Sequence, residues 1–166
     1  MTGRVSRLAA GVRLTSLLLA VLFALAALAD SQRGRVNTDS DNLAILGYDT
    51  VAYFTLGQAT PGREQFAVEW QDARWLFNSA AHRDLFAANP ISYAPQFGGF
   101  CAGAITHGVK VAADPEAWTI VDGKLYMNVS KESRGRWAQN PEKNIEKGDE
   151  HWVGLMGPIE QRDSSP

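Results

Sequence analysis

The chain has 166 residues, of which 16 are basic and 18 are acidic, giving a formal net charge of −2. This balance argues against nucleic acid as a partner, because phosphate binding needs a basic face. A single cysteine, Cys101, excludes an internal disulfide framework.

Residues 1–29 have the pattern of a secretory signal peptide. Three arginines and no acidic residue precede an apolar run over residues 14–29, which ends in Ala-Leu-Ala. The run is 16 residues long, shorter than the ~20 residues that comfortably span a bilayer. We therefore expect cleavage and no stable membrane insertion afterwards, with an uncleaved anchor as the alternative.

Cleavage would leave 137 residues with 13 basic and 18 acidic side chains, and 13 minus 18 gives a net charge of −5. These values fit one periplasmic or secreted domain with its own core. Residues 30–41 are polar and predict a flexible linker. We place the domain at residues 42–156 and a disordered tail at residues 157–166.

The first predicted supersecondary element is a β-hairpin. Residues 66–70 and 74–77 are aromatic and β-branched, and a three-residue connection, 71–73, separates them. Ser79 then predicts the N-cap of a helix over residues 80–88, which Asn89-Pro90 would end. On that helix His82, Leu85 and Phe86 share one face.

The segment that follows carries the lone thiol. Gly98 and Gly99 allow backbone conformations closed to other residues, or the close approach of another group. Residues 102–107 predict a short helix with Gly108 as its C-terminal cap. Cys101 would then lie at a helix N-terminus, where peptide dipoles favour a thiolate.

The C-terminal third predicts one further hairpin and two helices. Asp122-Gly123 lies between strand-like residues 118–121 and 124–128 and favours a type I′ turn. Asp114-Pro115-Glu116 is typical of a turn or helix start. Ser130 is a candidate cap for a helix through Trp137, and Pro141 opens a last helix to about Trp152. Two hairpins packed with short helices predict a small, single α+β domain.

The candidate metal ligands are Cys101, His107 and His82. Thiolate and imidazole suit copper or zinc, but His107 lies six residues after Cys101, so a regular helix would separate the two side chains. His82 beside Leu85 and Phe86 also fits an inward histidine with satisfied hydrogen bonds. His151 is expected at an exposed end of the chain. We expect the aromatic residues to lie mainly in the hydrophobic core.

Several segments resemble the exported YHS-domain proteins of bacteria. They are Gly47-Tyr48-Asp49-Thr50-Val51-Ala52-Tyr53-Phe54, residues 70–77 and 79–90, Tyr93-Ala94-Pro95-Gln96-Phe97-Gly98-Gly99-Phe100-Cys101-Ala102, and residues 114–128. The resemblance covers about residues 43–155. It implies a compact α+β domain, export, and metal handling through the cysteine position that Cys101 matches.

Three hypotheses of function follow. The first is a periplasmic or secreted binding module, and not an enzyme, that takes a soft metal ion or a small ligand at Cys101. The second is a redox or nucleophilic enzyme that uses the same thiol with a histidine as base. In the third, Cys101 is a buried small hydrophobe of a structural or interaction module.

Overall fold

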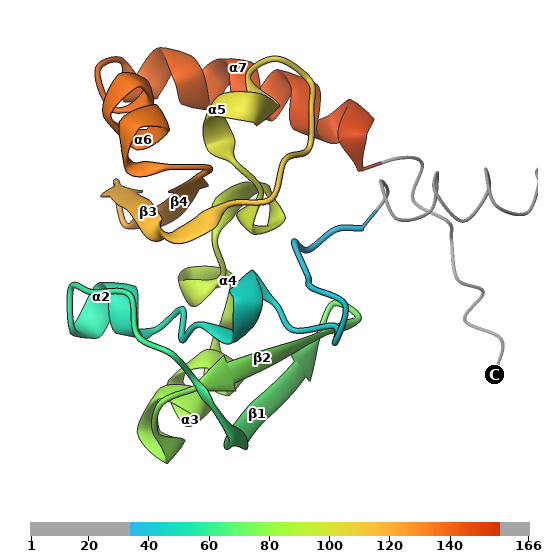
Figure 1. Ribbon diagram of the computed structural model, residues 1–166, viewed down its shortest axis with the longest axis vertical. Coiled ribbons are helices and arrows are strands. Elements are labelled where there is room, and N and C mark those ends of the chain that lie inside the picture. The colour runs from blue at the N-terminus through green and yellow to red at the C-terminus, as the bar shows by residue number, and fades with distance from the viewer. Residues whose placement is uncertain (1–33, 157–166) are drawn as a thin grey trace, which may run out of the picture. The chain divides into compact units, whose positions relative to one another are not determined.

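A computed structural model describes residues 34–156, so the predicted signal peptide and C-terminal tail lie outside the described residues (Figure 1). The described part is a small α+β domain with two separate two-stranded antiparallel sheets, β1-β2 and β3-β4. In chain order its elements are η1 (Ile45–Gly47), α2 (Ala52–Thr55), β1 (Arg63–Trp70), β2 (Ala73–Phe77), α3 (Ala80–Ala88), α4 (Pro90–Tyr93), η2 (Gln96–Gly99), α5 (Ala102–Ile105), β3 (Asp114–Val121), β4 (Lys124–Asn128), α6 (Lys131–Trp137) and α7 (Pro141–Leu155).

Both hairpins form where the sequence predicts them, and both turns have two residues. Asp122 and Gly123 have φ values of 51° and 72°, as a type I′ turn requires. Gln71 and Asp72 have φ values of 51° and 59°, and Trp70 pairs with Ala73. The predicted three-residue connection was wrong, because Gln71 and Asp72 both adopt positive φ without a glycine.

The predicted helices are largely confirmed, with three corrections. The helix predicted over residues 102–107 ends at Ile105, and its C-cap is Thr106 and not Gly108. Ser79 and Ser130 cap α3 and α6, since their hydroxyls accept hydrogen bonds from backbone N–H groups three residues on. Leu85 does not share the buried face with Phe86, because it is 42% exposed while Phe86 is fully buried. Asp114 begins β3 rather than a turn or helix, and the register shift that follows it accommodates Pro115 within the strand.

Residues 36 and 37 are packed, although the sequence predicts a flexible linker there. Val36 and Asn37 are buried. The Asn37 N–H donates to Gly98 O, and its side-chain amide donates to Gly99 O at 3.2 Å. The polar composition of residues 30–41 does not reveal this packing, because the hydrogen bonds of Asn37 go to a loop more than 60 residues away.

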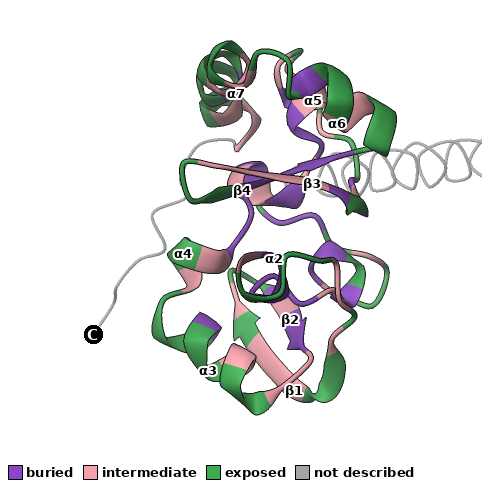
Figure 2. Ribbon diagram, turned by 90° about the vertical axis from the view of Figure 1, so that its left-hand side faces the viewer, coloured by how far each residue is buried: buried purple, intermediate pink, exposed green. Residues whose placement is uncertain are grey.

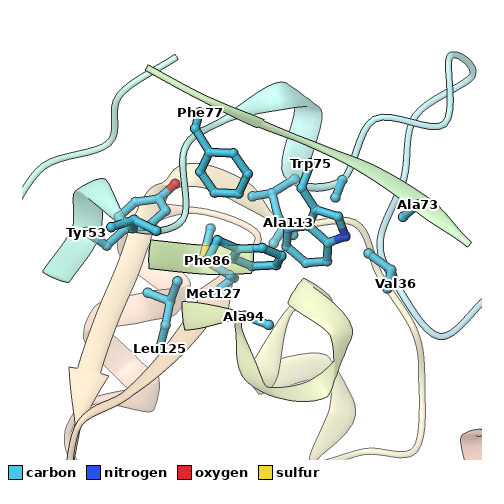
Figure 3. Close-up of a cluster of buried hydrophobic side chains, with 13 residues drawn as sticks. Val36, Tyr53, Ala73, Trp75, Phe77, Phe86, Ala94, Ala113, Leu125 and Met127 are labelled. Carbon is cyan, nitrogen blue, oxygen red and sulfur yellow. The ribbon is translucent and has the colours of Figure 1, made fainter. Parts of the chain in front are cut away.

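Two groups of buried side chains hold the described residues together. The larger joins the β1-β2 half to β4 and includes Trp75, Phe77, Phe86 and Met127 (Figure 3). The second lies among η2, α5, β4 and α6 and includes Phe97, Ile105, Tyr126 and Trp137. Burial is concentrated in β2, β4 and the region of α5 (Figure 2). The predicted core role of the aromatic residues is thus confirmed for Tyr53 and Phe97, which are buried.

Within residues 34–156, none of the helices is both long and apolar enough to cross a bilayer.

Candidate functional site

The Gly98-Gly99 pair places Cys101 through close backbone packing. Both glycines have positive φ, 59° and 79°. A Cβ on Gly98 would lie 1.9 Å from the carbonyl oxygen of Arg35, so only glycine fits there. The chain then enters α5 with Cys101 at its N-cap, as predicted. The Cys101 N–H donates to Val111 O at 2.8 Å, which fixes the backbone beneath the thiol.

The thiol of Cys101 is buried and bonded to an amide. Only 1% of Cys101 is exposed, and its Sγ donates to Oδ1 of Asn128 at 3.9 Å. The same oxygen accepts from the Gly103 N–H at 3.3 Å, which fixes the orientation of the Asn128 amide. A Cβ on Gly103 would lie 3.4 Å from Ser133 Oγ, so α6 approaches this cluster closely.

A pocket of about 420 Å³ opens beside this cluster. Its lining comes from α5, the loop after it, α6 and α7. The lining residues are Cys101, Gly103, Ala104, Thr106, His107, Val111, Val129, Ser133, Arg136, Trp137 and Asn144. We call it the Cys101 pocket. None of these residues is an aspartate or a glutamate, so the lining offers hydrogen-bond donors and cations with no carboxylate.

Two buried donors at this site have no hydrogen-bond partner among the described residues. They are Nε1 of Trp137 and Nδ2 of Asn128, on residues that are 3% and 0% exposed. A buried N–H left without a partner costs about 1–3 kcal/mol. Trp137 lines the pocket and Asn128 contacts the thiol that lines it. Both donor atoms therefore lie next to the pocket, each with less than 1 Å² of exposed surface.

The indole of Trp137 is held rigidly by its neighbours. It packs on Tyr126 with ring centroids 5.1 Å apart, and burial raises the pKa of the Tyr126 phenol, helped by Asp149 and Asp122. Asn144 on α7 donates to the Trp137 carbonyl oxygen at 2.9 Å. The Trp137 side chain and backbone are thus held by contacts with β4 and α7.

The three predicted metal ligands are not gathered into one cluster. His107 lines the Cys101 pocket and is exposed. Both ring nitrogens of His82 are bonded elsewhere, Nδ1 to Asp49 at 2.6 Å and Nε2 to Thr55 at 3.1 Å. No group of three or more His, Cys, Asp or Glu side chains suited to a metal ion occurs in residues 34–156. Of the three predicted ligands, Cys101 and His107 line the same pocket and His82 does not.

A second cavity, of about 210 Å³, is mostly aromatic and apolar. Trp70, Trp75 and Trp152 line it together with Arg35. His151, predicted at an exposed end, is exposed, and its Nδ1 lies 3.0 Å from Lys147 O. Neither feature adds a reactive group to the Cys101 pocket.

A scan against family models, a search of the curated proteins and a search of the solved structures each found no match.

Sequence reasoning missed the α6 side of the pocket. Ser133, Arg136 and Trp137 are spaced at i, i+3 and i+4, which places them on one helical face. That spacing was available once a helix was predicted after Ser130. Asn128 carried no comparable signal, because its partner Cys101 lies 27 residues earlier in the chain.

Proposed function

We propose that the chain is an exported, YHS-like binding module that takes a small anionic or acceptor-rich molecule in the Cys101 pocket. The observation that carries the proposal is the pair of buried, unpartnered donors, Trp137 Nε1 and Asn128 Nδ2. The signal-peptide pattern and the resemblance described above support export and the family.

The chemistry of the lining favours an anion over a cation. Arg136 and His107 supply positive charge or N–H groups, and Ser133 and Asn144 add neutral polar groups. Arg136 is paired with Glu132, but both side chains are well exposed, and such surface pairs contribute little. A carboxylate or phosphate would displace this pairing, and a small movement of the Trp137 side chain would let it accept from the indole N–H as well.

The second candidate is binding of a soft metal ion, because a thiol and an imidazole line the same pocket. A closed zinc site usually takes four ligands, and the described residues do not provide three in one place. Zinc therefore fits poorly, and copper(I) with Cys101 and His107 is the form of this candidate that we retain.

Calorimetric titration with phosphate, acetate, succinate and citrate tests the first candidate. We expect at least one anion to bind the unaltered protein. Trp137→Phe keeps an aromatic ring but removes the indole N–H. The lost hydrogen bond is worth about 1 kcal/mol, so the affinity for the anion should fall about fivefold. Trp152→Phe, in the other cavity, is the matched control and should bind as before.

Two outcomes contradict the proposal: none of the four anions binds, or Trp137→Phe binds as tightly as the unaltered protein. Copper(I) titration of the unaltered protein and of Cys101→Ser distinguishes the metal candidate. Copper binding that Cys101→Ser abolishes, without anion binding, would replace the first candidate by the second.

A further inference from the structure

A second polar cluster lies outside the Cys101 pocket and shares no residue with it. Asp49, His82 and Thr55 form a continuous hydrogen-bonded chain. Asp49 precedes α2, Thr55 is its last residue, and His82 lies on α3. The chain runs from a fully buried carboxylate, through a side chain that is 12% exposed, to an exposed hydroxyl.

The carboxylate of Asp49 is fixed as a hydrogen-bond acceptor. Its Oδ1 accepts from the N–H groups of Val51 and Ala52 at 2.9 and 3.2 Å. Its Oδ2 accepts from the Asn78 N–H at 2.9 Å and lies 2.6 Å from Nδ1 of His82. Since Asp49 meets only N–H donors, Nδ1 of His82 carries the proton that it donates.

This arrangement sets the tautomer of the imidazole. In neutral His82 the proton on Nδ1 leaves the lone pair on Nε2, which faces Thr55 Oγ1 at 3.1 Å. The Thr55 hydroxyl donates a hydrogen bond to Val51 O at 3.1 Å, and Nε2 of His82 is the alternative acceptor for the same proton. Val51 O already accepts two backbone N–H groups, so donation to His82 leaves no acceptor unsatisfied.

We propose that Thr55 is a nucleophile activated by His82 and Asp49, and that it accepts acyl groups from small activated esters. A hydroxyl within 2.6–3.2 Å of a base that a third group orients is the recurring geometry of nucleophilic catalysis. Thr55 and His82 line neither cavity described for residues 34–156. Because Thr55 is exposed and lies outside both of these cavities, we expect small esters with a good leaving group rather than large acyl substrates.

The reaction balances with water as the only co-reactant. Thr55 Oγ attacks the ester carbonyl carbon while its proton passes to His82 Nε2. The tetrahedral intermediate then breaks the bond to the leaving alcohol, which takes that proton. Water, deprotonated by His82, then attacks the carbonyl carbon of the acyl-threonine. Breaking the bond to Thr55 Oγ releases the carboxylic acid, and His82 returns the proton to Oγ, which restores the hydroxyl.

The probe is p-nitrophenyl acetate with the full chain. We expect release of p-nitrophenol, detected as p-nitrophenolate once it ionises in the buffer, and an acetyl group on Thr55, located by mass spectrometry of the acid-quenched, digested protein. Thr55→Val should abolish that adduct, and His82→Gln should slow its formation by about 10²-fold, the low end of general-base catalysis. Thr55 is exposed, so its valine variant should fold, and circular dichroism checks both variants.

Two matched controls complete the experiment. Thr60→Val removes a hydroxyl whose bond goes to Gln58 O at 3.4 Å and not to a histidine. His151→Gln removes an exposed imidazole that contacts a backbone oxygen. Both should acetylate Thr55 at the unaltered rate. Release of p-nitrophenolate no faster than in buffer with no acetyl group on Thr55 after rapid acid quenching, or equal rates for folded His82→Gln and the unaltered protein, would overturn the proposal.

Discussion

At the scale of single residues, Gly98 and Asn128 fix the geometry around Cys101. Gly98 allows the backbone of Arg35 and Val36 to pass within van der Waals distance. Asn128 holds the Cys101 thiol and the Gly103 N–H with one oxygen. The thiol, buried and bonded to an amide, has no general base among its described contacts, which weakens the hypothesis of a thiol enzyme.

Gly98→Ala tests the close approach directly. The added Cβ would meet Arg35 O at 1.9 Å, and the residue also has a φ of 59°. Strain and overpacking together should lower the free energy of unfolding by about 2–4 kcal/mol. Gly123→Ala is the matched control, since its φ is 72° but nothing lies within 4 Å. It should lose only about 1 kcal/mol. Equal losses in urea denaturation would contradict this account.

At the scale of elements, the sequence carried most of the local information. Ser79, Ser130 and Pro141 marked the starts of α3, α6 and α7 correctly, because capping depends on residues three or four positions apart. The local pattern at Asp114 led to a wrong prediction, because it does not include the strand with which Asp114 pairs. Its side chain does bond the Glu116 N–H at 2.9 Å, as in a turn, but pairing with Asn128 places it at the start of a strand.

Substitutions at the helix caps test whether loss of a capping hydroxyl costs more stability than an ordinary surface substitution. Ser79→Ala and Ser130→Ala each remove an acceptor for a backbone N–H, at 3.2 and 3.1 Å. Each should lower the free energy of unfolding by about 1 kcal/mol. Ser92→Ala, at an exposed position of α4, should stay within about 0.5 kcal/mol of the unaltered protein. Denaturation of the three variants checks this, and a neutral effect at both caps would refute it.

At the scale of the whole molecule, the α+β class was predictable from local signals, but the long-range contacts were not. Asn37 reaches Gly99 across 62 positions, and Asp49 reaches His82 across 33. The sequence analysis gave Asp49 no role, and it treated His82 as a candidate metal ligand or an inward histidine. Their contact depends on where α3 lies relative to the turn that begins at Asp49, which no periodicity specifies.

The most direct test of the proposed binding module is an NMR titration of the indole N–H signals. The anion added is the one that binds most tightly in the calorimetric titrations. The indole N–H signals of all five tryptophans are followed. The Trp137 N–H has no partner among the described residues, whereas that of Trp75 already donates to Trp70 O at 2.9 Å. We predict that the Trp137 signal shifts with saturation and that the Trp75 signal stays in place. A stationary Trp137 signal at saturating anion would contradict the account.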